Sequence, residues 1–239
     1  MGGRAPPSVT RSFPLWPTFG TACIVVLAAF AGGILAGIPA VLAFGSPKNP
    51  GDLGANVIEA AFYLGGAAAL IPLLEIVSGR SLAALGVRPL DARDWGFVAG
   101  ALLIVLGLQL LYQLILSLFH QQNHVQAGFA NFHVQTPEAA TFVLVNGAVI
   151  APIVEELFFR GLLFNAISVR TPVYAAALLS GVIFGIAHGD PVLFPVLALF
   201  GTVQAVFYRM SGNLVVPMVV HGANNALFLS LMMAVPGFH

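Results

Sequence analysis

Long apolar stretches separated by short polar segments run through the whole chain. Runs of about 18 or more apolar residues indicate membrane spans, and a helical span needs about 20 residues. We therefore predict an all-α fold, a polytopic transmembrane helix bundle with about seven spans. An eighth span would require the fourth segment to divide at Pro152, and each half would be short for a hydrocarbon core of about 30 Å. The seven predicted spans are Thr21–Phe44, Gly54–Val77, Gly96–Phe119, Ala139–Ile167, Val173–His188, Val192–Arg209 and Leu214–Val235.

The composition supports lipid as the solvent of this chain. Hydrophobic residues make up 59% of the 239 residues and charged residues 8%, against roughly a quarter charged in a soluble domain. The formal net charge is zero, so a nucleic-acid partner is not expected. Cys23 is the single cysteine, which excludes a disulfide framework or a thiolate metal cluster within one chain. The first apolar run exceeds the signal-peptide core of about 7–15 residues, so we expect a retained anchor.

The basic residues predict the orientation in the membrane, because cytoplasmic loops carry the excess of Lys and Arg. With the N-terminus inside, only Lys48 falls outside, and we expect a cytoplasmic N-terminus, an external C-terminus and a location in a bacterial cytoplasmic membrane. The loop Ser78–Trp95 is expected to be interfacial, with one amphipathic turn. The loop Gln121–Pro137 and its flank hold His120, His124 and His133, for which no metal role is expected. The inside residues are Arg4, Arg11, Arg80, Arg88, Arg93, Arg170 and Arg209.

Polar and ionisable residues inside the predicted spans gather in the C-terminal half. An ionisable residue in a span costs about 2.5 to 3.5 kcal/mol on insertion scales, so each is a candidate functional residue. Glu156 and Arg160 are four residues apart, so they share a helix face and can form an ion pair. Glu155 is turned by about 100° from that face and is free to point into the bundle. The other candidates are His188 in the fifth span and His221 and Asn225 in the seventh.

Helix rise suggests that these residues meet near the middle of the membrane. At about 1.5 Å per residue, Glu155 lies about 22 Å from the cytoplasmic end of its helix and His188 about 24 Å. Asn225 lies at about 18 Å and His221 at about 12 Å. Four polar side chains from three helices are therefore predicted to converge.

Such a layer suits attack of water on an amide bond. Glu155 with His188 could hold and deprotonate the water, while His221 and Asn225 could donate hydrogen bonds to the oxyanion. A zinc mechanism is the main alternative, with Glu155, His188 and His221 as ligands, although the HExxH pattern is absent. We favour a metal-independent mechanism without a cofactor. Serine or cysteine catalysis is disfavoured because Ser180 lacks an obvious base and Cys23 is remote.

The ordered motifs EExxxR, FxxxH and HxxxN on successive hydrophobic helices resemble the CAAX-protease and bacteriocin-processing (CPBP or ABI) family of intramembrane endopeptidases. The segment LAALGVRP before the third span is also similar. The resemblance covers Pro137 to Val235. It implies that Glu155 is the catalytic glutamate, that His188 positions the water, that His221 and Asn225 stabilise the oxyanion, and that Glu156 and Arg160 form the supporting ion pair. The implied substrate is a membrane-embedded or lipidated peptide or protein.

The expected organisation is then a cytoplasmic tail at residues 1–20, N-terminal transmembrane helices at 21–136, catalytic helices at 137–235 and a C-terminal tail at 236–239. Other functions fit the same residues. The Glu156–Arg160 pair could be structural only. Glu155, His221 and Asn225 could hydrogen-bond between helices, and His188 could be a solvated interfacial residue. Buried Glu and His residues also serve proton-coupled transporters, and a non-proteolytic immunity or scaffold factor is a further alternative. Glu59 and Glu75 are interpreted as interfacial or structural and are left out of the site.

Overall fold

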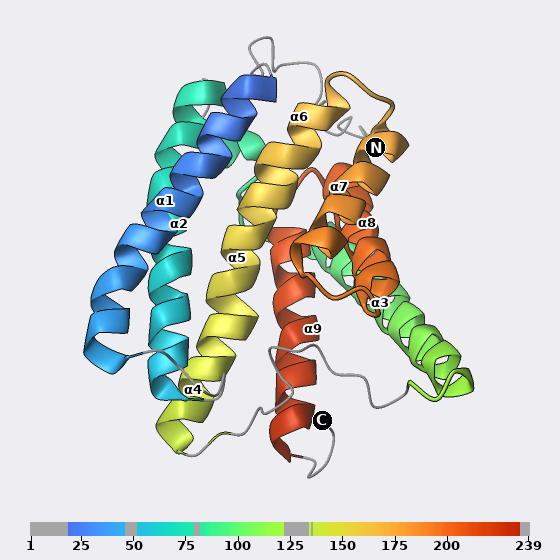
Figure 1. The fold of residues 1–239 in the computed structure, drawn as a ribbon. Helices are drawn as coiled ribbons and strands as arrows, with labels where there is room; N and C mark the ends of the chain where they lie inside the picture. Colours follow the sequence, from blue (N-terminus) through green and yellow to red (C-terminus); the bar gives the residue numbers. More distant parts are fainter. Residues whose placement is uncertain (1–18, 46–51, 79–81, 122–133, 135, 235–239) are drawn as a thin grey trace.

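The computed structural model describes residues 19–45, 52–78, 82–121, 134 and 136–234. All the regular elements in these residues are helical, which confirms the all-α class (Figure 1). The expected tails and four residues of the orientation argument, Arg4, Arg11, Lys48 and Arg80, lie outside the described residues. The loop residues His124 and His133 also lie outside them. The helices are α1 (Phe19–Phe44), α2 (Leu53–Ser78), α3 (Ala92–Leu118), α4 (Pro137–Val145), α5 (Ala151–Glu156), α6 (Asn165–Ser168), α7 (Val173–Ala187), α8 (Phe194–Ser211) and α9 (Val215–Ala234).

Five of these helical segments are long and apolar enough to cross a membrane by length and composition. They include α1, α2, α3 and α9, and a continuous helix of 32 residues from Pro137 to Ser168 that contains α4, α5 and α6. The helix continues through Pro152, so it does not divide there as an eighth span would require. The segment α7, with 15 residues, is shorter and also apolar. Large hydrophobic side chains are exposed along the outer helices, as expected of a surface that faces lipid.

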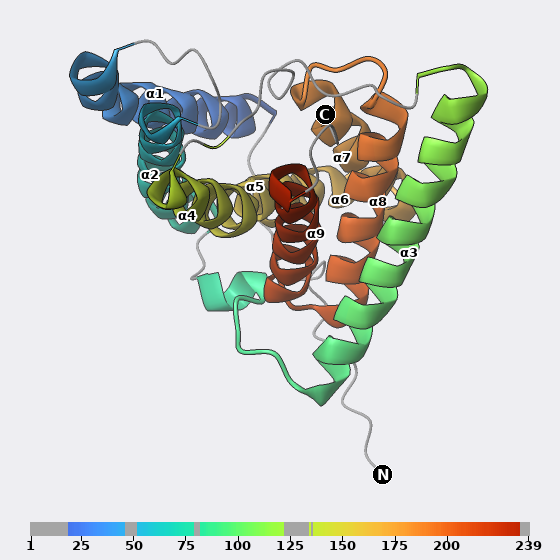
Figure 2. The ribbon, with the colours of Figure 1, turned by 90° about the horizontal axis from the view of Figure 1, so that it is seen from below.

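The helices α1 and α2 form an antiparallel pair at one side of the molecule (Figures 1 and 2). Small residues let the two backbones approach: a Cβ atom added at Gly65 would lie 2.5 Å from the carbonyl oxygen of Gly32. Close contact through glycines is typical of helix association in membranes. The helix α1 packs chiefly against α2, while α2 also packs along α4 and α5.

The continuous helix Pro137–Ser168 lies between the α1–α2 pair and the group formed by α7, α8 and α9 (Figure 2). One face of this helix meets a buried cluster that contains Leu70, Leu74 and Leu157. The opposite side meets a second cluster, which includes Phe159 of the same helix, Phe184 of α7 and residues of α3, α8 and α9. The helix is therefore central, and its polar residues lie where several helices meet.

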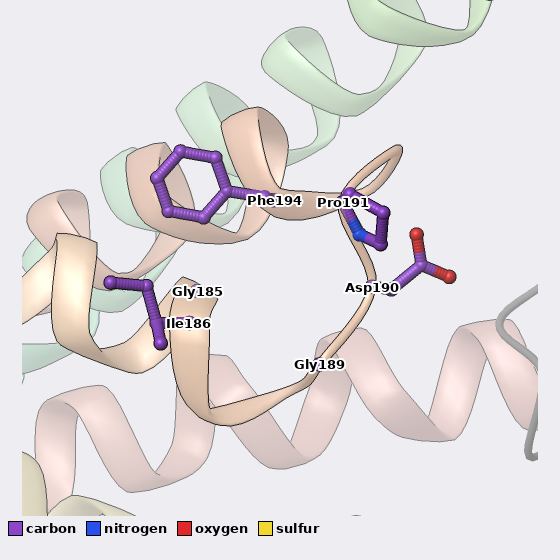
Figure 3. A pocket seen from close by; sticks show the side chains of 6 residues that line it. All are labelled: Gly185, Ile186, Gly189, Asp190, Pro191 and Phe194. Carbon is purple, nitrogen blue, oxygen red and sulfur yellow. The ribbon is translucent and has the colours of Figure 1, made fainter.

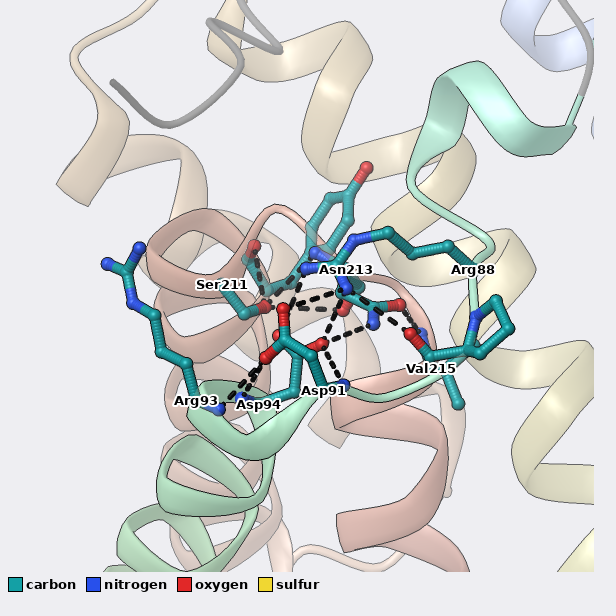
Figure 4. Close-up of polar contacts among 9 residues, drawn as sticks. Arg88, Asp91, Arg93, Asp94, Ser211, Asn213 and Val215 are labelled. Atoms are coloured by element: carbon teal, nitrogen blue, oxygen red, sulfur yellow. Dashed lines mark hydrogen bonds and ion pairs between the residues drawn. The ribbon is translucent and has the colours of Figure 1, made fainter. Parts of the chain in front are cut away.

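A polar network fixes the start of α9 (Figure 4). The carboxylate of Asp94 accepts hydrogen bonds from Arg88 at 2.7 and 3.1 Å and from the side-chain amide of Asn213 at 2.9 Å. Asp94 and Asp91 also form the capping box of α3, which satisfies amide groups at the helix start. The segment that precedes Arg88 includes a short 3₁₀ turn, Leu82–Leu85, in the expected interfacial loop.

Gly86 and Gly212 bring this loop against the turn between α8 and α9. Both have positive φ angles, of 85° and 62°, which glycine adopts without steric cost. A Cβ atom on Gly86 would lie 2.3 Å from the carbonyl oxygen of Gly212. The amide of Leu214 donates to the carbonyl of Gly86 at 3.0 Å. The beginning of α9 is thus held by backbone contacts as well as by the polar network.

Candidate active site

The continuous helix is π-helical on both sides of the two glutamates. Asn146–Ile150 precedes α5 and Leu157–Phe164 follows it. The amide of Ala151 donates to the carbonyl of Asn146, five residues earlier. The next bond in this register would run from residue 152 to Gly147, but Pro152 has no N–H group. Asn225 of α9 supplies the missing donor, since its side-chain amide donates to the carbonyl of Gly147 at 2.9 Å.

The helix α9 approaches this π segment very closely. A Cβ atom added at Gly222 would lie 2.3 Å from the carbonyl oxygen of Ala148. Only glycine leaves room for such a contact. The approach places the neighbouring His221 beside the glutamates.

Glu156, Arg160 and His221 form a buried chain of hydrogen bonds. The Glu156 and Arg160 side chains have no exposed surface, and the Nη1 atom of Arg160 lies 2.9 Å from Oε1 of Glu156. The same oxygen lies 2.9 Å from Nδ1 of His221. The Nη2 atom of Arg160 donates to the carbonyl of Gly201 at 2.9 Å. This ion pair agrees with the prediction from the four-residue spacing.

The tautomer of His221 follows from these contacts. A carboxylate can only accept hydrogen bonds, so Nδ1 of His221 carries the proton that it shares with Glu156. When Nδ1 carries the only proton of the ring, Nε2 presents a lone pair. This atom lies 3.9 Å from Oε2 of Glu155.

Glu155 points away from Arg160 and toward α2 and α9. Its Oε1 atom accepts a hydrogen bond of 2.8 Å from the hydroxyl of Tyr63. Its Oε2 atom is buried without a hydrogen-bond partner, although 18% of the side chain is exposed. Glu155 thus has one oxygen fixed by Tyr63 and one buried oxygen without a hydrogen-bond partner.

Aromatic rings form the wall around His221. The ring centroids of Phe184 and Phe200 lie 5.7 and 5.0 Å from that of His221. His188 is the C-cap of α7, and its ring lies 4.4 Å from Phe184 between centroids. The Nδ1 atom of His188 lies 2.8 Å from the carbonyl oxygen of Phe184 and so donates to it. Both histidines therefore use Nδ1 as a donor.

Four of the six predicted residues lie within direct contact of one another: Glu155, Glu156, Arg160 and His221. His188 joins them through the ring of Phe184, and Asn225 lies one turn further along α9, on the carbonyl of Gly147. Predictions about their roles in a reaction stay predictions.

Sequence reasoning missed the contribution of α2. Tyr63 was not considered, and Glu59 was set aside, yet Oε2 of Glu59 accepts a hydrogen bond of 2.7 Å from Asn146. A signal was present, because Glu59 and Tyr63 are polar, lie four residues apart in an apolar span and so share a face. Glu75 accepts from the amide of Leu82 at 3.2 Å, which fits its interpretation as structural.

The side chains at the site offer few ligands for a metal ion. Structural and catalytic zinc sites use at least three protein ligands. Among the residues that the structure describes, no three His, Cys, Asp or Glu side chains are grouped as such ligands. Glu155 and His221 alone supply two donors, and we derive no step through a metal.

A hollow lies beside His188, between the end of α7 and the start of α8 (Figure 3). It has a volume of about 380 Å³ and is largely apolar. Asp190 closes one side, and its carboxylate accepts from the amides of Val192 and Leu193, both at 2.9 Å. The remaining lining residues are Gly185, Ile186, Gly189, Pro191 and Phe194.

Fold and site together define an integral membrane protein with a buried carboxylate–histidine centre. Residues 137–227 match the family model described as "Type II CAAX prenyl endopeptidase Rce1-like". This match supports, over this part of the chain, the resemblance drawn from the three motifs. "Putative membrane peptidase YdiL" of Bacillus subtilis (strain 168) is 30% identical over 99 residues, which are 41% of this chain and 40% of that protein. No solved structure matches the chain.

Proposed function

We propose that the protein is an intramembrane endopeptidase that hydrolyses a peptide bond of a membrane-embedded or lipidated peptide or protein. Glu155 acts as the general base. The observation that carries the proposal is the 3.9 Å separation between Oε2 of Glu155 and Nε2 of His221. The carboxylate oxygen is a hydrogen-bond acceptor, and Nε2 is also an acceptor when Nδ1 carries the only proton of the ring.

Two acceptors at this distance suit a water molecule between them. A water oxygen can lie about 2.8 Å from each and donate one hydrogen to each. Its own lone pairs are then directed away from both acceptors and toward a substrate carbonyl. Glu155 takes one proton as the oxygen attacks the carbonyl carbon, and returns this proton to the leaving amine when the C–N bond breaks. His188 is the second group expected to position the water.

The oxyanion requires donors on the other side of the carbonyl. The sequence predicts His221 and Asn225 as these donors. Asn225 has two amide hydrogens, and Gly147 uses one of them. The second hydrogen of the water stays on the attacking oxygen and keeps its hydrogen bond to Nε2 of His221, while Glu156 keeps the proton of Nδ1 in place. In this arrangement His221 positions the nucleophile, and Asn225 is the donor that acts on the oxyanion. One lost oxyanion donor typically reduces kcat by about 100- to 1000-fold.

The test is the variant Glu155→Gln in purified, reconstituted protein. We expect it to abolish hydrolysis of a lipidated or membrane-embedded reporter peptide that the parent cleaves, while the thermal transition stays near that of the parent. The amide keeps the shape of the side chain and removes the base. Glu138→Gln is the matched control, because Glu138 is exposed in the first turn of α4 in the same continuous helix. Full activity of Glu155→Gln would refute the mechanism.

The same inactive variant gives access to the substrate. A base-deficient site still binds its substrate, so peptides retained by Glu155→Gln and not by the control can be eluted and sequenced. Their cleavage by the parent then identifies the bond that is hydrolysed.

A strong chelator tests the proposal that no metal is required. The glutamate–water mechanism predicts that the rate is unchanged after chelation and dialysis. A zinc mechanism predicts loss of activity and recovery on adding metal. The expected ligands in that case are Glu155, His188 and His221.

A further inference from the structure

Tyr63 of α2 lies outside the segment that matches the family model, residues 137–227. Its hydroxyl nevertheless contacts the proposed base directly, at 2.8 Å from Oε1 of Glu155. The other oxygen of Glu155 is the one directed at His221. A donor on Oε1 therefore fixes the rotation of the carboxylate and leaves Oε2 for the water.

A second contact holds the same face of α2 against the catalytic helix. Glu59 precedes Tyr63 by four residues and accepts the hydrogen bond of Asn146 at 2.7 Å. Asn146 begins the π segment before α5. Phe62, next to Tyr63, packs edge-on against Phe30 of α1 with ring centroids 5.9 Å apart. The orientation of Tyr63 is thus set on both sides, by a polar contact to the catalytic helix and by an aromatic contact to α1.

From this arrangement we propose that Tyr63 is a positioning residue, which orients the Glu155 carboxylate for attack of the water. The inference rests on the proposed function of Glu155. It assigns part of the active site to the N-terminal half of the chain. The hydroxyl acts through Glu155 and takes no part in bond formation, so its loss should reduce kcat and leave substrate binding unchanged.

The test compares Tyr63→Phe with Tyr112→Phe. Tyr112 lies in α3, and its hydroxyl donates a hydrogen bond to the carbonyl of Val192. The control therefore also loses one hydrogen bond of a tyrosine hydroxyl, but one that does not involve Glu155. For Tyr63→Phe we expect kcat to fall by about 10- to 100-fold, the scale of one hydrogen bond to a charged group, with KM within about twofold. A comparable fall of kcat in Tyr112→Phe would overturn the assignment.

An infrared measurement separates this inference from the proposed function, since it does not need activity. The carboxylate stretching band that disappears in Glu155→Gln belongs to Glu155. That band should shift in Tyr63→Phe, which removes its donor, and should not move in Tyr112→Phe. An unshifted band in Tyr63→Phe would overturn the positioning role. A shifted band combined with full activity of Glu155→Gln would retain the contact and reject the endopeptidase mechanism.

Discussion

Arg160 connects three helices at the level of single residues. It pairs with Glu156 in its own helix, donates to Gly201 of α8, and its guanidinium lies 5.0 Å from the ring centre of Phe184 in α7. The carboxylate that it neutralises also orients His221. A change at Arg160 therefore affects folding and the site together.

We expect Arg160→Ala to lower both folded yield and activity. The change leaves Glu156 buried without its counter-charge, and breaking a buried pair typically costs about 3 to 5 kcal/mol. The measurement is the thermal transition in detergent, with Arg93→Ala as the control, since Arg93 is an exposed residue near the start of α3.

The double change Glu156→Gln with Arg160→Gln should recover part of the folded yield, because it removes both charges at once. It should not recover activity, because Glu156 no longer holds the tautomer of His221. A single Arg160→Ala variant as stable as the parent would show that the pair is not essential to the fold.

Residue spacing predicted the Glu156–Arg160 pair because both partners lie in one helix, where geometry is fixed by the backbone. It could not predict that Glu156 also binds His221, or that Tyr63 binds Glu155. Those contacts depend on how α2 and α9 are rotated about their axes. Rotation is set by close contacts such as Gly222 against Ala148, which a single sequence does not reveal.

At the level of elements, the π-helical segment before α5 depends on a side chain from another helix. Pro152 removes the donor for Gly147, and Asn225 replaces it. In a membrane, water does not satisfy a freed carbonyl, so neighbouring groups must do so. Asn225 therefore has a structural role beside the predicted catalytic one.

The two roles can be separated by combining variants. We expect Asn225→Ala to lower the thermal transition, by a free energy of about 1 to 3 kcal/mol for the carbonyl left unsatisfied, and to reduce kcat. Adding Pro152→Ala provides an N–H group for Gly147 and should restore stability but not kcat. Asn224→Ala, at the half-buried neighbouring position, should leave the thermal transition and kcat near the parent values. Recovery of kcat in the double variant would assign Asn225 a structural role alone.

At the scale of the described molecule, each of the seven predicted apolar runs coincides with a helical segment, with ends within a few residues of those observed. Five of these segments are long and apolar enough to cross a membrane by length and composition, and α7 and α8 are not among them. This part of the fold is predictable because the hydrocarbon core demands long apolar helices with satisfied backbones. The π segments were not predicted. They require a register change that apolar composition does not encode.

The orientation remains a prediction at this scale. Reporter fusions at the two ends should lie on opposite sides of the membrane, with the N-terminal reporter in the cytoplasm, because basic residues are concentrated on one set of loops. In Figure 1, α1 begins at the upper end of the bundle and α9 ends at the lower end. A cytoplasmic reporter at the C-terminus would contradict it.

The position of the α1–α2 pair at the edge of the bundle couples the site to the bilayer. The helix α1 packs chiefly against α2, whereas the start of α9 is locked to the loop before α3 through Gly86 and Gly212. A change in bilayer thickness is accommodated by helix tilt, and we expect the pair at the edge of the bundle to tilt more than α9. Because α2 carries Tyr63, tilt would alter the contact to Glu155. The rate of hydrolysis by the parent should therefore depend on the acyl-chain length of the lipid, and this dependence should be weaker in Tyr63→Phe.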